Sequence, residues 1–334
     1  MKPKRTSAAS DATTIRVVIV TLDSHLASAA DRAQHMLLRE LPGLRLALHA
    51  ASEWGEDAAA LAACRADIAQ ADILVVTMMF MDDHVRLIQQ DLRARREQCD
   101  ALVGCMSGTD IVRLTRAGRF AMDKSISGPL ALLRRLRGRQ QTSDGKPASA
   151  GAQQLKMLRR IPQILRFIPG TAQDVRAYFL TLQYWLAGTD DNIANLVRLL
   201  VSRYADGPRR ALRDAVNAQP PREFPDVGVY HPRMKNAIAE NVQQLPARTA
   251  RHRGSVGLLV MRSYVLAGNT RHYDGVIAAL EARGLHVVPA FSCGLDARPA
   301  VQRFFVRDGR ASRPQENAGT TCSPRASSAA ITPS

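Results

Sequence analysis

Aromatic residues are scarce in this chain of 334 residues, at 5%, and long apolar runs are missing. No stretch reaches the roughly 18 to 20 apolar residues that a membrane-spanning helix needs. The first 11 residues are polar and carry no signal-peptide core. We therefore expect a protein of the cytoplasm. With 46% apolar residues, the chain is long enough for two compact domains, each with its own core.

Cysteine is rare, and its spacing indicates no pairing. The five cysteines, none in a CxxC pair, are Cys64, Cys99, Cys105, Cys293 and Cys322. An odd, scattered set suits reduced thiols, so we expect no disulfide and no structural zinc. No His, Cys, Asp and Glu set has metal-ligand spacing, and we expect no metal site. P-loop, HExxH, GxSxG, EF-hand and GxGxxG patterns are also missing, which argues against a nucleotide site in this chain.

Positive charge dominates the sequence. The formal net charge is +16, almost entirely from arginine, because lysine occurs at only six positions. Such a surplus fits nucleic acid, an acidic membrane surface, an anionic ligand or an acidic partner. The sparse aromatics argue against stacking on single strands. Nine Lys or Arg accompany one acid over residues 130–166, a pattern typical of a solvated helical face or of docking to an acidic surface.

Hydrophobic periodicity predicts an α/β fold. Short apolar runs indicate strands over residues 15–22, 44–50, 72–80 and 101–106. Helical spacing lies between them, over residues 24–41, 56–70 and 82–97. Strands that alternate with helices of this length favour an open parallel sheet covered by helices on both faces.

Composition divides the rest of the chain. We expect a disordered N-terminus over 1–13, an N-terminal α/β domain over 14–138 whose last helix spans 126–138, a linker over 139–152 and a helical segment over 153–222. In that segment Thr171 and Asp174 resemble a capping box before a helix over 175–186. The start of a second α/β domain, incomplete, follows over 223–309, with strands at 227–230, 256–262 and 285–290 and a helix at 271–283. Residues 310–334 have the composition of a disordered tail and suggest a shifted reading frame.

Several polar or polarisable side chains follow the predicted strands, at the carboxyl edge where open α/β folds bind ligands. Asp23, Ser24 and His25 follow the first strand, although Asp23 or Ser24 could equally cap the next helix. Met79 and His84 follow the third, and a methionine there could line an apolar cavity or simply fill the core. Cys105 would need a cationic neighbour to act as a nucleophile.

Two later strand ends combine aromatic and basic groups. His231 and Arg233 follow one of them, and the other carries Arg262, Tyr264 and Asn269. Arginine can hold a carboxylate through two parallel hydrogen bonds, so these loops are candidate ligand-binding segments. Purely structural turns are the alternative.

Three blocks of the sequence resemble the magnesium chelatase H subunit family, and less closely the related cobaltochelatase large subunit. They span residues 106–120 (MSGTDIVRLTRAGRF), 155–186 and 254–305. The resemblance, over residues 14–309, implies a porphyrin-handling protein into whose bound protoporphyrin IX Mg2+ is inserted during chlorophyll and bacteriochlorophyll synthesis. It also implies two AAA+-type partner subunits, I and D, that hydrolyse ATP, which fits the missing P-loop.

Members of that family are several times longer than this chain. The part that encloses porphyrin during metal insertion lies mostly beyond residue 309, so we expect no turnover from this chain alone and carry over no catalytic residue. The alternatives are a non-catalytic module that binds a porphyrin or an acidic partner, a homologue of the cobaltochelatase large subunit, and a nucleic-acid-binding protein.

Overall fold

The structure is a computed structural model that describes residues 13–123, 160–247, 253–294, 296–307 and 310–311. The chain divides into two units, the first made of residues 1–226 and 260–273 and the second of 227–259 and 274–334. The predicted linker, the helix over 126–138 and nearly all of the predicted tail lie outside the described residues. No helix in the described ranges is long and apolar enough to cross a membrane.

The first unit is built on a sheet with strand order β2-β1-β3-β4-β5-β6. Its four parallel strands are β1 (Ile15–Thr21), β2 (Leu44–Ala50), β3 (Ile73–Thr77) and β4 (Ala101–Cys105). The two short antiparallel strands that extend the β4 edge are β5 (Arg116–Ala117) and β6 (Phe120–Ala121). The predicted α/β class and parallel sheet are confirmed, and the β5–β6 hairpin is an addition that the periodicity did not indicate.

Alternation along the strands sends side chains into two cores. Val18 and Val20 of β1 pack under two helices on one face, α2 (Ala58–Gln70) and α3 (Asp82–Arg96). Ile15, Val17 and Ile19 pack on the other face, beneath α1 (Ala27–Leu37). Short helical pieces, η1 (Ala51–Glu53) and α4 (Thr109–Arg113), follow β2 and β4. The amphipathic pattern of the strands thus sets a three-layer arrangement.

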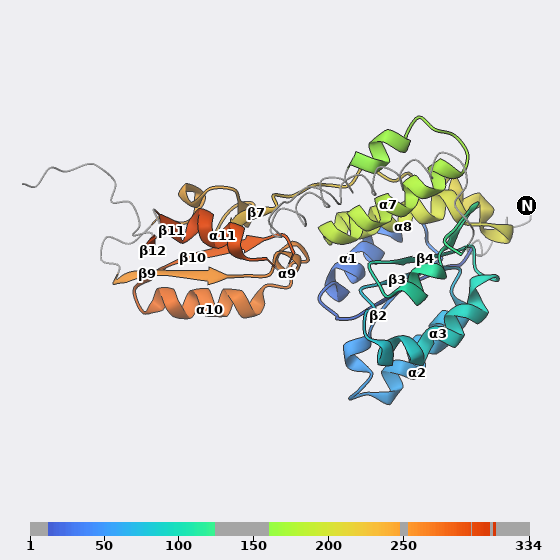
Figure 1. Cartoon of the computed structure of the whole chain (residues 1–334), viewed down its shortest axis with the longest axis horizontal. Coiled ribbons are helices and arrows are strands. Elements are labelled where there is room, and N and C mark those ends of the chain that lie inside the picture. The colour runs from blue at the N-terminus through green and yellow to red at the C-terminus, as the bar shows by residue number, and fades with distance from the viewer. Residues whose placement is uncertain (1–12, 124–159, 248–252, 295, 308–309, 312–334) are drawn as a thin grey trace, which may run out of the picture. The chain divides into compact units, whose positions relative to one another are not determined.

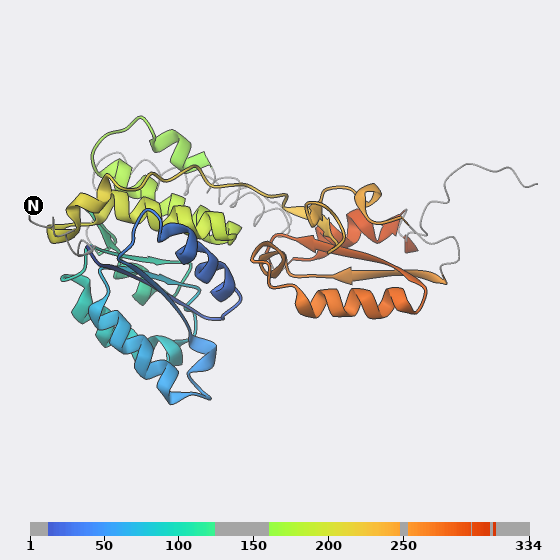
Figure 2. The ribbon, with the colours of Figure 1, turned by 180° about the vertical axis from the view of Figure 1, so that it is seen from behind.

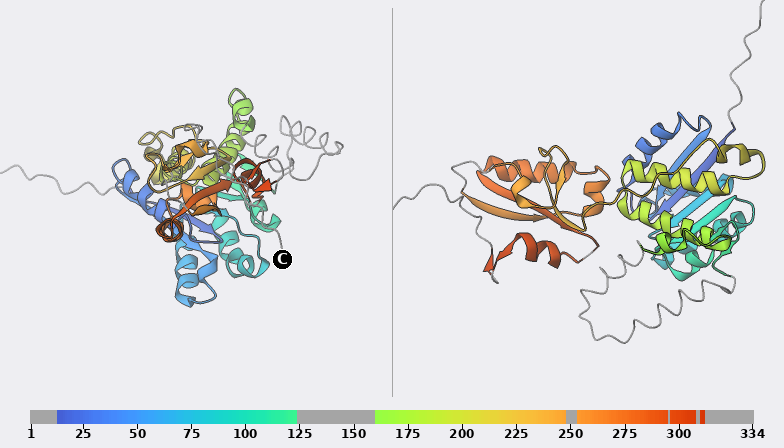
Figure 3. Two further views of the ribbon diagram at one scale, coloured as in Figure 1. Left: turned by 90° about the vertical axis from the view of Figure 1, so that its left-hand side faces the viewer. Right: turned by 90° about the horizontal axis from the view of Figure 1, so that it is seen from above.

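Two long helices complete the cover over the α1 face. They are α7 (Thr171–Ala187) and α8 (Asp190–Tyr204), and their buried side chains join the same core as Ile15 and Ile19. In Figure 2 they lie on the opposite side of the sheet from α2 and α3, and the right-hand view of Figure 3 shows them over the strands. The helical segment predicted over 153–222 is therefore part of the first unit, because its apolar faces fill that unit's core.

The predicted capping box does not form. The N-cap of α7 is Gly170 and makes no side-chain cap, while Asp174 accepts a hydrogen bond from the Arg119 N–H at 3.0 Å. At α8 the cap is Thr189, which accepts from the Asn192 N–H. After α8 a short helix, η2 (Gly207–Arg213), leads to residue 226.

The second unit carries a sheet of order β8-β7-β10-β9 (Figure 1). Its strands are β7 (Val227–Tyr230), β8 (Ile238–Ala239), β9 (Gly254–Leu259) and β10 (Leu285–Ser292). Strands β9 and β10 are parallel and joined through α10 (Arg271–Ala282), so the predicted βαβ arrangement is confirmed. The remaining elements are η3 (Val242–Gln244), α11 (Arg298–Phe304), β11 (Val306–Arg307) and β12 (Arg310–Ala311).

One segment was expected to be a loop and is a helix. Residues 262–266 form α9 (Arg262–Leu266), and residues 260–273 pack with the first unit rather than the second. Arg262, Val265 and Leu266 of α9 are buried, and their i, i+3, i+4 spacing places the three side chains on one face of a helix.

We predict that Leu200→Ala destabilises the whole first unit. Leu200 of α8 is 0% exposed in the core shared with β1, and such a truncation costs about 3 kcal/mol. Hydrogen exchange followed by mass spectrometry should show faster global exchange in β1 and β3 peptides as well as in α8. Leu38→Ala, at a leucine that is 36% exposed, is the matched control and should change exchange little. Faster exchange confined to α7 and α8 would show that the hairpin is energetically separate from the sheet.

Candidate functional site

The first sheet has a topological switch point between β1 and β3. From β1 the chain moves to β2 on one side, and the next strand, β3, lies on the other side of β1. In open α/β folds the carboxyl edge at such a point is where ligands bind. The segments that follow β1 and β3, residues 22–26 and 78–81, therefore form the candidate edge.

Asp23 and His25 form a compact hydrogen-bonded turn at this edge. The Asp23 carboxylate accepts from the His25 N–H at 3.1 Å, and Nδ1 of the His25 ring contacts the same oxygen. The hydrogen bond from the His25 side chain holds the pKa of Asp23 below its ordinary value. The N-cap alternative for Asp23 and Ser24 is wrong: α1 starts after Leu26, without a side-chain cap, and Ser24 is exposed.

Tyr264 of α9 is brought onto His25 from far along the chain. Their ring centroids lie 5.2 Å apart with an interplanar angle of 22°, a stacked arrangement. Burial, and after it the nearby Asp23 carboxylate, raises the pKa of Tyr264. Arg32 of α1 donates to the Ala267 carbonyl at 2.8 Å and so ties the end of α9 to α1. The structure thus brings two of the predicted segments into contact.

Further rings extend this cluster. His272 and Tyr273 lie edge-on to Tyr264, with centroids at 5.6 Å and 6.5 Å. The two are themselves 3.9 Å apart. Neither His272 nor Tyr273 was identified from the sequence, because they sit inside a helical pattern that indicates α10 and nothing more. We call His25, Tyr264, His272 and Tyr273 the ring cluster.

The ends of β3 and β4 are backbone-strained. Met78 and Met106 have φ of 61° and 47°, a left-handed conformation that costs energy for a long side chain. The Met78 N–H donates to the Met106 carbonyl at 2.9 Å, and Ser107 Oγ accepts from the Met79 N–H at 3.1 Å. Strain of this kind gathers at functional sites, where surrounding contacts maintain it.

Aromatic and apolar side chains follow β2 and β3 at the same edge. Trp54 packs edge-on against His84, with centroids 6.0 Å apart at 77°. His84 Nδ1 is buried and has no hydrogen-bond partner within the described residues. Phe80 and Met81 are 54% and 53% exposed, so the edge presents an apolar surface to solvent.

Three of the predicted ligand-binding residues make contacts within the fold. Met79 is 0% exposed and belongs to the core under α2 and α3, which is the core-filling alternative. Arg262 is 7% exposed and donates to the carbonyls of Pro225 and Phe224, at 2.8 Å and 3.1 Å. Asn269 lies just after α9, where its N–H donates to the Tyr264 carbonyl.

His231 and Arg233 belong to the second unit, and the ring cluster belongs to the first. His231 is 1% exposed, with Nε2 at 3.2 Å from a Glu281 oxygen, and the Arg233 guanidinium meets the same oxygen. Tyr230, next to His231, donates to Asp274 at 2.5 Å. These contacts fasten β7 and the following turn to α10.

The surroundings of Cys105 do not activate its thiol as a nucleophile. It is fully buried at the end of β4, and burial raises the pKa of its thiol to about 12. Within the described ranges, no group of three or more His, Cys, Asp or Glu is placed to hold a metal ion.

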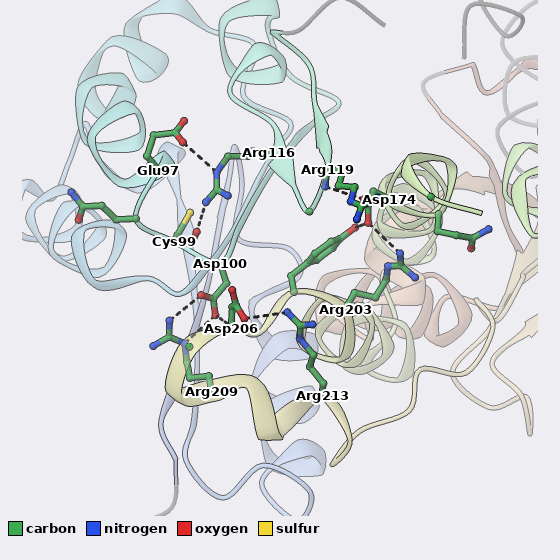
Figure 4. A pocket seen from close by; sticks show the side chains of 16 residues that line it. Glu97, Cys99, Asp100, Arg116, Arg119, Asp174, Arg203, Asp206, Arg209 and Arg213 are labelled. Atoms are coloured by element: carbon green, nitrogen blue, oxygen red, sulfur yellow. Dashed lines mark hydrogen bonds and ion pairs between the residues drawn. The ribbon is translucent and has the colours of Figure 1, made fainter. Parts of the chain in front are cut away.

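A second feature lies at the opposite, amino end of the first sheet. It is a polar cleft of about 780 Å3, shown in Figure 4, between the end of α3, the β5–β6 hairpin, the start of α7, the end of α8 and η2. Its charged lining residues are Glu97, Asp100, Arg116, Arg119, Asp174, Arg203, Asp206, Arg209 and Arg213. Sequence reasoning missed it, because these side chains come from five separate segments with no common motif.

Two protein families match successive parts of the chain. Domain of unknown function (DUF3479) matches residues 16–179, and CobN/Magnesium Chelatase matches residues 182–316. The magnesium-chelatase H subunit of Cereibacter sphaeroides is 46% identical over 289 residues, and that of Rhodobacter capsulatus is 45% identical over 291. The chain is similar to the N-terminal part of magnesium-chelatase H subunits. The predicted family resemblance is thereby confirmed.

The similarity has clear bounds. Each of these two alignments covers 86% of this chain, which spans only about 24% of the length of the chelatase H subunits. The chloroplastic ChlH subunit of magnesium chelatase from Oryza sativa subsp. indica is 27% identical, covering 87% of this chain and 21% of that protein. The solved "Catalytic Subunit of Cobaltochelatase from Mycobacterium tuberculosis" aligns with 87% of this chain and 17% of its own, at 16% identity and a TM-score of 0.39. A TM-score of this size does not establish a common fold.

We predict that the second unit of this chelatase-like chain loses stability in mild acid. Burial lowers the pKa of His231 below its ordinary 6.5, although the hydrogen bond and the negative charge of Glu281 raise it. As the pH falls below 6.5, His231 becomes protonated in the unfolded chain while it stays neutral in the folded chain. The free energy of unfolding therefore falls until the pH drops below the pKa of His231 in the folded chain.

Hydrogen exchange of β10 peptides between pH 7.5 and pH 5, corrected for intrinsic rates, measures this effect. In His231→Gln the fall in stability over this window should be smaller than in the wild type. Equal falls in both proteins would mean that His231 does not govern the acid sensitivity.

Proposed function

We propose that this chain is a part of the porphyrin-handling subunit of magnesium chelatase, which holds protoporphyrin IX while Mg2+ is inserted. In this proposal ATP is hydrolysed by two AAA+-type partner subunits, I and D, and the product feeds chlorophyll or bacteriochlorophyll synthesis. The 45–46% identity to chelatase H subunits supports the assignment. The absence of any P-loop motif from this sequence agrees with ATP hydrolysis by partners.

Within the chain, we propose that the carboxyl edge of the first sheet contacts the macrocycle. The observation that carries this is the stack of Tyr264 on His25 at the switch point, 5.2 Å between centroids. A porphyrin is a flat π-system, and aromatic rings bind such systems face to face or edge to face. Exposed Phe80 and Met81 add adaptable apolar surface at the same edge.

The propionate groups of a porphyrin also need hydrogen-bond donors. Arg271 and His272 are exposed at the start of α10, and the His272 ring contacts Tyr264. A guanidinium binds a carboxylate through two parallel hydrogen bonds, so Arg271 is the group we assign to this role. Arg262, which sequence reasoning favoured, is occupied by two main-chain carbonyls.

We predict that Tyr264→Leu and His25→Leu each raise the Kd for protoporphyrin IX about fivefold, the size of one aromatic contact. The Kd comes from quenching of tryptophan fluorescence in the full chain, which holds Trp54 and Trp185. His35→Leu is the matched control, because His35 is exposed on α1 and its ring contacts only the Asp31 carbonyl.

The two possible failures differ. If protoporphyrin IX does not quench the wild type saturably, porphyrin binding by this chain is wrong. If it binds the wild type and both edge variants equally, binding stands but the carboxyl edge is not the contact surface.

A further inference from the structure

The polar cleft at the amino end of the first sheet is independent of the ring cluster and of the proposed function. Its lining side chains come from residues 97–119, 170–174 and 203–213, all within the first unit. Figure 4 shows its two acid clusters, one around Asp100 and the other around Asp174. What the cleft binds depends on which hydrogen-bonding groups these clusters leave available.

The two buried acids are already satisfied. Asp100 receives Nε and an η nitrogen of Arg209 at 3.0 Å and 2.9 Å, and the Asp206 N–H at 3.0 Å. Asp174 receives the Arg119 N–H at 3.0 Å, an Arg203 η nitrogen at 3.1 Å and the Tyr204 hydroxyl at 3.3 Å. Both carboxylates therefore have little acceptor capacity left for a ligand.

Gly118 fixes Asp174 in this position. Its φ is +60°, and a Cβ there would lie 2.9 Å from both carboxylate oxygens. Only glycine lets the β5–β6 turn approach the carboxylate so closely and present the N–H of Arg119. The Asp174 carboxylate thus links the segments that form the cleft wall.

Two arginines of the lining, in contrast, have donors without a partner among the described residues. The exposed Arg119 guanidinium makes no hydrogen bond or ion pair with any described residue. Arg203 Nε is buried and has no partner within the same residues. Figure 4 shows both side chains beside Asp174. An arginine carries five N–H donors and no acceptor, so a ligand must bring acceptors to use them.

The described lining carries five arginines against four acids. Gly170, the uncapped N-cap of α7, also lines the cleft. The unpaired N–H groups at a helix N-terminus carry partial positive charge. Outside the lining, burial lowers the pKa of Arg176, and the charges of Arg203 and Arg166 lower it further.

The lining offers little aromatic surface. Among the described lining residues the single aromatic one is Tyr204, which is 5% exposed and whose hydroxyl is bound to Asp174. A macrocycle or a nucleobase would find no exposed aromatic side chain to stack on, and a compact polyanion needs no such stacking.

We propose that this cleft binds a compact oxyanion ligand, with Arg119 and Arg203 as the main donors. The shared chemistry is that of phosphate or carboxylate oxygens, supplied by a small polyanion. The cleft volume of about 780 Å3 leaves room for more than one such group.

Isothermal titration of the full chain with pyrophosphate, and separately with citrate, tests this proposal. Sodium chloride at the same ionic strength serves as the blank. We expect saturable binding, weakened about tenfold in Arg119→Gln by loss of a charge-assisted contact. The tighter of the two ligands identifies phosphate or carboxylate as the source.

Arg86→Gln is the matched control, because Arg86 is exposed on α3 and is not a lining residue of the cleft. It should bind like the wild type. Absence of saturable binding for both anions overturns the proposal. So does equal affinity of Arg119→Gln and wild type, since non-specific attraction to a basic protein would give that result.

Discussion

The arrangement of the first unit follows from one constraint: a parallel sheet must be covered on both faces. The βαβ crossovers supply α2 and α3 to one face but only α1 to the other. The α7–α8 hairpin completes that second layer, and its helices are buried over most of their length. The same packing determines both candidate sites, because α7 contacts α9 and starts at the polar cleft.

Several arginines in the described part of the chain have structural partners. Arg209 binds Asp100 and Asp72, and Arg198 grips Glu40 through two contacts, at 3.0 Å and 2.6 Å. Others, such as Arg95 and Arg262, donate to main-chain carbonyls. Arginine is suited to this because its planar fork satisfies several acceptors at once. Ion pairs of this kind leave the formal net charge of +16 unchanged, because the acids are already counted in it.

The local sequence pattern predicted the strands of the first sheet well, but it did not predict which residues cap the helices. Strand β2 has the bounds predicted for it, and β1, β3 and β4 differ by a few residues at their ends. Asp23 and Asp174 were expected to take part in helix caps, and their carboxylates instead accept hydrogen bonds from the N–H groups of His25 and Arg119. A short acid can bond to any nearby N–H, and local spacing does not say which one the folded chain will present.

The sequence by itself determined the α/β class, the order of the main helices and strands, and the similarity to chelatase H subunits. Those properties depend on hydrophobic period and on long matching blocks, which are local or linear. Only the tertiary structure decided that Tyr264 stacks on His25, that Arg262 faces main-chain carbonyls, and that Arg119 and Arg203 share a cleft. The physical reason is that a long polar side chain interacts with whichever groups the folded chain places near it. The packing of the common core determines which groups those are.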